Sequence, residues 1–61
     1  MIIEINGNFI DSVEIVNLYH LAQTPVGYKR YDRMKWAANE YGKAHGMKSI
    51  YAYKALERAI D

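Results

Sequence analysis

Residues 28–45, YKRYDRMKWAANEYGKAH, concentrate the side chains best suited to binding chemistry, because five of the eight Lys and Arg residues and the only tryptophan lie there. Ammonium and guanidinium groups contact phosphates, and an aromatic ring stacks on nucleic-acid bases. Five residues of the segment repeat every three or four positions, as one face of a helix does. They are Lys29, Arg33, Trp36, Glu40 and Lys43. This face is a candidate binding surface.

The same segment has a second interpretation as a protein-binding surface, since Tyr, Trp and Arg dominate the energetics of such surfaces. The residues that would form it are Tyr28, Lys29, Arg30, Arg33 and Trp36. The structural alternative buries the long helix on two sides, with Trp36 packed under the N-terminal hairpin. In so small a domain a lone tryptophan usually belongs to the core, and we favour that interpretation for Trp36.

The sequence contains no set of residues spaced like a known catalytic site. His20 and His45 fall in different expected elements, and Ser12 and Ser49 have no base beside them. The chain has no cysteine, no cluster of metal ligands and no glycine-rich phosphate loop. We therefore expect no enzymatic activity, no cofactor, no metal and no small-molecule substrate.

The 61 residues are enough for one domain, and a chain this short buries only about 60% of the surface that its unfolded form exposes. Without disulfides, stability must come from helix packing, aromatic burial or self-association, so a homodimer is a structural option.

The net charge of +1 conceals an uneven distribution: residues 1–24 contain Glu4, Asp11 and Glu14 and no Lys or Arg. The basic remainder suggests an anionic partner, and the alternative is ordinary solvated surface.

The N-terminus lacks the charged and apolar regions of a secretory signal, and no apolar run approaches the roughly 18 residues of a membrane span. We expect a soluble cytoplasmic protein that has no membrane partner. Its size and its lack of a catalytic constellation resemble the accessory proteins of phages and mobile elements.

Two elements are predicted before residue 25. Asn6-Gly7 lies between short apolar runs and predicts a β-hairpin over about residues 2–10. Asp11 can cap a following helix over about residues 12–22, and Glu14 completes a capping-box pattern. The β-branched residues between 13 and 16 argue for a third strand instead. We favour the helix because of the cap.

Two longer helices follow. Thr24 and Pro25 predict the start of a helix over about residues 25–45, in which Gly42 is a weak point that invites a close-packing explanation. Gly46 interrupts the pattern, and Ser49 is a plausible N-cap for a last helix to about residue 60. The expected core stripe of the long helix is Tyr31, Met34, Ala38, Tyr41 and His45. That of the last helix is Ala52, Ala55, Leu56 and Ala59.

Residues 41–58, YGKAHGMKSIYAYKALER, resemble the helix-turn-helix of small DNA-binding proteins, with a small residue at Gly42 and the turn glycine at Gly46. The resemblance covers about a third of the chain. Two positions depart from the helix-turn-helix pattern. Gly42 stands where these proteins usually have alanine, and Ala52 stands where they usually have a branched apolar residue. An ordinary αα-hairpin is the structural alternative. The resemblance implies a DNA-facing set with phosphate contacts: Lys43, Lys48, Ser49, Tyr51, Lys54 and Arg58, with Arg33 as a further phosphate clamp.

Together these patterns predict a small α+β domain, with an N-terminal β-hairpin packed on two or three helices. The leading functional hypothesis is a regulatory or accessory protein that binds double-stranded DNA as a dimer. The competing hypothesis is an inhibitor or adaptor that binds a partner protein through the basic aromatic face of the 25–45 helix.

Overall fold

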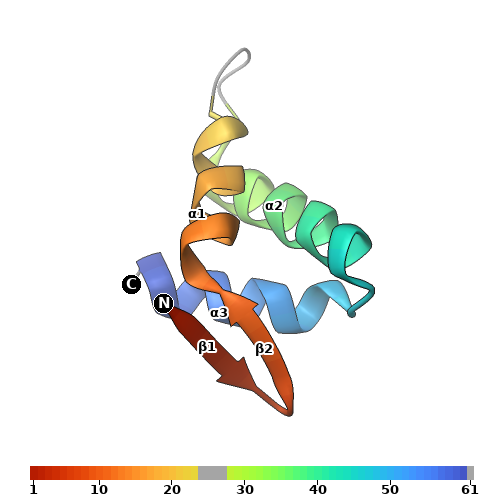
Figure 1. The fold of residues 1–61 in the computed structure, drawn as a ribbon. Helices are drawn as coiled ribbons and strands as arrows, with labels where there is room; N and C mark the ends of the chain where they lie inside the picture. Colours follow the sequence, from red (N-terminus) through yellow and green to blue (C-terminus); the bar gives the residue numbers. More distant parts are fainter. Residues whose placement is uncertain (24–27, 61) are drawn as a thin grey trace.

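A computed structural model of the chain, described for residues 1–23 and 28–60, consists of a β-hairpin and three helices (Figure 1). The strands are β1 (Ile2–Ile5) and β2 (Asn8–Asp11). The helices are α1 (Ser12–Leu21), α2 (Arg30–His45) and α3 (Ser49–Ile60). This confirms the predicted α+β class. Among the helices in these two ranges, none combines the length and apolarity that a bilayer crossing requires.

The backbone conformation of the turn at Asn6-Gly7 determines the hairpin. Asn6 and Gly7 have φ values of 51° and 82°, as both central positions of a type I′ turn require. β1 and β2 pair antiparallel, with Ile3 opposite Ile10. Both of these side chains are buried, so one face of the hairpin packs on the helices.

Helix α1 begins at the cap that the sequence predicts, because the Asp11 carboxylate accepts a hydrogen bond of 3.0 Å from the backbone N–H of Val13. Residues 12–21 are therefore helix rather than a third strand. The predicted capping box is wrong. The backbone N–H of Asp11 donates to the Tyr41 hydroxyl at 2.9 Å, and the Glu14 carboxylate lies 2.7 Å from Nε2 of His45.

Helix α2 starts later than predicted. Tyr28 is not helical, and Lys29 is the extended N-cap, with φ −66° and ψ 157°, whose carbonyl accepts from the N–H of Arg33 at 2.9 Å. The predicted start at Thr24 and Pro25 lies outside the residues that the structure describes. The helix ends at His45, as expected.

The core stripe of α2 was predicted correctly in its middle and wrongly at its ends. Met34, Ala38 and Tyr41 are buried, whereas Tyr31 is 63% exposed and His45 is also exposed. The reason is that α1 and α3 both pack against α2 and together cover its centre. Two further residues there, Ala37 and Gly42, are buried as well.

The turn between α2 and α3 depends on two glycines. Gly46 ends α2 in the left-handed conformation, with φ 65°, and the N–H of Met47 donates to the carbonyl of Gly42 at 3.0 Å. A Cβ atom on Gly42 would lie 2.7 Å from the Met47 carbonyl oxygen, so the predicted close packing is confirmed. Ser49 is the first residue of α3 rather than its cap.

Helix α3 is the central element, because it contacts α1, α2 and both strands (Figure 1). Its small buried residues, Ala52 and Ala55, allow this close approach, and Leu56 fills the centre. The hairpin, α1 and α2 contribute the rest of the core, which includes Ile10, Ile15 and Tyr41.

Candidate nucleic-acid interface

Helices α2 and α3 enclose a shallow surface hollow of about 180 Å³, which no hairpin residue lines within the described part of the chain. Its lining residues are Lys35, Ala38, Asn39, Ser49, Ile50 and Tyr53. The ring of Tyr31 lies 6.3 Å from that of Tyr53 and extends this surface toward the start of α2. The hollow combines one cation, two short polar side chains and exposed apolar groups.

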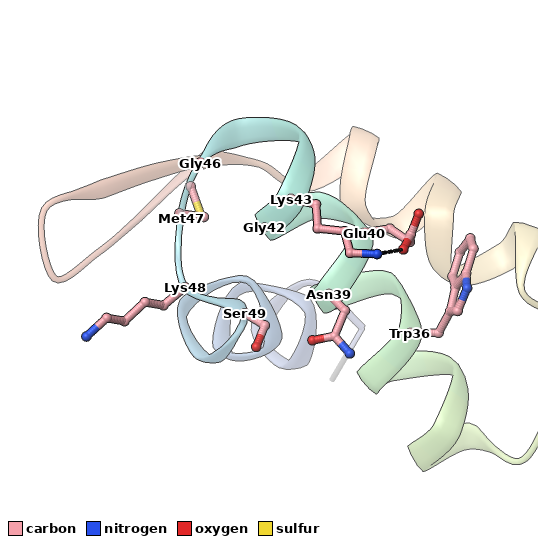
Figure 2. A pocket seen from close by; sticks show the side chains of 9 residues that line it. All are labelled: Trp36, Asn39, Glu40, Gly42, Lys43, Gly46, Met47, Lys48 and Ser49. Atoms are coloured by element: carbon pink, nitrogen blue, oxygen red, sulfur yellow. Dashed lines mark hydrogen bonds and ion pairs between the residues drawn. The ribbon is translucent and has the colours of Figure 1, made fainter.

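A second, larger hollow of about 550 Å³ lies at the turn between the two helices (Figure 2). It is lined by Trp36, Asn39, Glu40, Gly42, Lys43, Gly46, Met47, Lys48 and Ser49. Asn39 and Ser49 belong to both hollows and therefore lie at their junction. The turn thus gathers three of the residues predicted to contact DNA, which are Lys43, Lys48 and Ser49.

The charged side chains at the turn do not converge on one point. Figure 2 shows Lys48 directed away from α2, whereas Lys43 extends toward Glu40, whose carboxylate lies 3.4 Å from the ammonium group. The Lys43 side chain is 78% exposed, so this ion pair contributes little to stability. Cations spread in this way suit an extended anion such as a nucleic-acid backbone better than a compact one.

Two of the other predicted DNA contacts, Tyr51 and Arg58, are engaged with the hairpin. The Tyr51 hydroxyl accepts a hydrogen bond of 2.9 Å from the side-chain amide of Asn6, and the Arg58 guanidinium donates to the carbonyl of Glu4 at 3.3 Å. Both side chains therefore contact the hairpin. Lys54 lies between them in the sequence and is exposed. The structure separates Tyr51 and Arg58 from the residues at the turn.

The residues of the predicted protein-binding surface are also divided. Tyr28, Lys29 and Arg30 are exposed at the start of α2. Arg33 is half-buried, with its guanidinium 5.2 Å from the centre of the Tyr19 ring, a cation–π distance. Its Nε atom is buried and has no hydrogen-bond partner within the described parts of the chain.

Trp36 is half-buried and packs against the edge of the core. Figure 2 shows it well separated from the hairpin, so the expectation that it packs under the hairpin is wrong. The reason is that the hairpin lies on α3, whereas Trp36 belongs to the face of α2 that turns away from the strands.

Several residues of this surface were not predicted from the sequence. Ile50 is 57% exposed in the first turn of α3. Tyr31, Lys35 and Asn39 lie four residues apart and line one edge of α2. That spacing is visible in the sequence, but Tyr31 was assigned to the core stripe instead.

Three of the serine and histidine side chains considered above as catalytic candidates contact other parts of the chain. The Ser12 hydroxyl is buried and donates to the carbonyl of Met1 at 2.9 Å. The ring of His20 lies 3.2 Å from the Gln23 side chain, and His45 pairs with Glu14. Within residues 1–23 and 28–60, no three His, Asp or Glu side chains lie close enough to hold a metal ion.

No family model, curated protein or solved structure matches this chain. Function is therefore inferred from the geometry and chemistry of the surface that α2, the turn and α3 form. Its two informative properties are two helices joined by a short turn and the exposed lysines Lys35, Lys43 and Lys48 beside them.

Proposed function

We propose that the protein is a small regulatory or accessory protein that binds double-stranded DNA through α2, the turn and α3. The supporting observation is the position of Ser49 at the junction of the two hollows, where the first turn of α3 is exposed. In helix-turn-helix proteins the N-terminal side chains of the second helix meet base edges in the major groove. The proposal includes a cytoplasmic location, which the cysteine-free composition suits.

The exposed residues have distinct roles in this proposal. Ser49 and Lys54, on α3, reach base edges, and Ile50 gives an apolar contact beside them. Lys48 from the turn and Lys35 and Lys43 from α2 contact phosphates and set the orientation of α3. Tyr51 and Arg58 hold the hairpin against α3 and so position the reading helix.

The test is fluorescence anisotropy with duplex DNA of random sequence, titrated at low and at near-physiological salt. Each phosphate contact contributes about 0.9 to the slope of log K against log salt concentration. Replacing Lys43 by Ala should reduce that slope by about one and weaken binding to all sequences equally. Lys54→Ala should instead reduce discrimination between a selected site and random DNA.

Lys29→Ala is the matched control, since Lys29 is the exposed N-cap of α2, at the end of the helix remote from the turn. The affinity of the Lys29→Ala variant for DNA should stay close to that of the wild type. Absence of binding even at low salt contradicts the proposal. An equal loss in the Lys29 and Lys43 variants contradicts the assignment of the surface, because it indicates general charge attraction.

A protein-binding function is the second candidate, and the exposure of two tyrosines at the start of α2 favours it. Tyr28 is 45% exposed and Tyr31 is 63% exposed, beside the basic residues Lys29 and Arg30. An acidic partner protein would match this chemistry. If DNA binding is absent, a pull-down with the wild type and a Tyr28→Ser/Tyr31→Ser variant tests it. A partner retained equally by both contradicts this assignment.

A further inference from the structure

The outer face of the hairpin exposes large apolar side chains that the proposed function does not use. Ile2 is 61% exposed and Phe9 is 69% exposed. Phe9 is paired with Glu4, and Ile2 lies two residues from Glu4 on the same strand, so Ile2 and Phe9 are diagonal neighbours on one face. An antiparallel sheet that faces water normally presents polar side chains there.

A separate exposed apolar surface lies beside the start of α1. Met1 is 80% exposed and Val13 is 58% exposed, and both line a surface hollow of about 260 Å³ together with Val16 and Ala59. The backbone N–H of Ser12 donates to the carbonyl of Met1 at 2.8 Å, which extends the strand pairing to the start of α1. Side chains alternate between the two faces of a strand, so Met1 lies on the face opposite Ile2. We call the exposed outer face around Ile2 and Phe9 the outer hairpin patch.

The edges of the hairpin are protected at two points, whereas its outer face is not covered. The N–H of Asp11 on the outer edge of β2 is held by the Tyr41 hydroxyl. The carbonyl of Glu4 on the outer edge of β1 accepts from Arg58. Figure 1 shows the hairpin at the periphery of the fold, with helix α3 on one side of it. A partner would therefore dock on the face rather than add a strand.

The carboxylates around the patch have donors within their own chain. Glu4 accepts from the N–H of Gly7 at 3.1 Å, Asp11 caps α1, and Glu14 pairs with His45. Residues 1–24 contain no Lys or Arg. In a two-fold symmetric interface, each group near the axis lies close to the same group of the other chain, so an unpaired charge would meet a like charge. Such an interface therefore favours an apolar centre and charges that are paired within each chain.

The size of the chain favours a second copy as the occupant. Stable interfaces bury about 800 Å² on each partner, which is about a fifth of the 4025 Å² surface of this chain. A domain of 61 residues without disulfides has a small core, and self-association is one of the usual ways to increase burial.

We propose that two copies of this chain associate through the outer hairpin patch, with Ile2 and Phe9 at the centre of the interface. The dimer leaves the exposed Ser49 and Ile50 side chains of each copy outside the interface, since neither lies on the outer face of the hairpin. The inference is independent of DNA binding.

Sedimentation equilibrium of the protein without an N-terminal tag tests the proposal, because a tag would adjoin the patch. The wild type should show a concentration-dependent dimer, and Phe9→Glu should weaken it by at least about 30-fold, as removal of an interface hot spot does. Ile50→Glu is the matched control, an equally drastic change at a 57% exposed side chain outside the patch. It should dimerise like the wild type.

Phe9→Thr is the second variant, since threonine retains strand propensity if the glutamate disturbs the hairpin. Circular dichroism confirms that each variant is folded. A wild type that stays monomeric up to about 1 mM overturns the proposal. So does a folded Phe9 variant that dimerises normally, or an equal loss in the Ile50 control. No DNA is present, so these outcomes leave the DNA-binding proposal to its own test.

Discussion

The Tyr41 hydroxyl lies 2.9 Å from the backbone nitrogen of Asp11 and accepts its hydrogen bond. Tyr41 is buried in the C-terminal half of α2, and Asp11 is the last residue of β2 and the N-cap of α1. The bond therefore joins the long helix to the junction of the hairpin and α1. It also satisfies the backbone donor that a capping box would have used.

Replacing Tyr41 by Phe should destabilise the fold by about 1–2 kcal/mol, because a partly buried N–H loses its acceptor while the buried ring stays in place. Urea unfolding with linear extrapolation measures the change. Tyr31→Phe is the control, since Tyr31 is 63% exposed, and it should shift stability by less than about 0.5 kcal/mol. Equal effects in the two variants would contradict the role of the Tyr41 hydroxyl.

Replacing Gly42 by Ala should destabilise the protein by about 1–3 kcal/mol, although alanine is the better helix former by about 1 kcal/mol. The new Cβ atom would lie 2.7 Å from the Met47 carbonyl oxygen, and backbone must move to admit it. Thermal unfolding followed by circular dichroism measures the effect. Lys43→Ala, at the next and exposed position, should be nearly neutral. An increase in melting temperature for Gly42→Ala would show that the turn can relax.

Replacing Gly7 by Ala separates backbone strain from crowding. Its φ of 82° is unfavourable for an L side chain, yet no atom lies within 4 Å of a Cβ placed there. The expected loss is about 1 kcal/mol, from the turn conformation alone. Asn6→Gly relieves the positive φ of 51° at the neighbouring position but removes the hydrogen bond to Tyr51. It is therefore compared in a Tyr51→Phe background, where it should not show this loss. Chemical denaturation of both variants gives the comparison, and a neutral Gly7→Ala would contradict it.

The pair of Glu14 and His45 should contribute measurably but weakly to the docking of α1 on α2. The atoms are 2.7 Å apart, but the side chains are 48% and 39% exposed. A double-mutant cycle with Glu14→Gln and His45→Gln should give a coupling energy of about 0.2–1 kcal/mol. His45 also stacks on Tyr41, with ring centres 4.2 Å apart, so the cycle is needed to isolate the pair. Zero coupling would contradict the contact in solution.

Local signals predicted most of the fold from the sequence alone. Asn6-Gly7 identifies the hairpin and Asp11 the start of α1, while Gly46 marks the end of α2. Each of these features depends on the backbone preference or hydrogen bond of residues a few positions apart. Gly42 was recognised as a close-packing position for the same reason: it stands out locally as a weak helix former.

The tertiary structure alone decided which side chains form the surface. Glu14 pairs with a residue 31 positions away, Tyr51 with one 45 away and Arg58 with one 54 away. A helical repeat gives the spacing of residues on a face, but the arrangement of the neighbouring elements determines which face they cover. Tyr31 is therefore exposed, Tyr51 contacts the hairpin, and the candidate DNA surface gathers around Ser49.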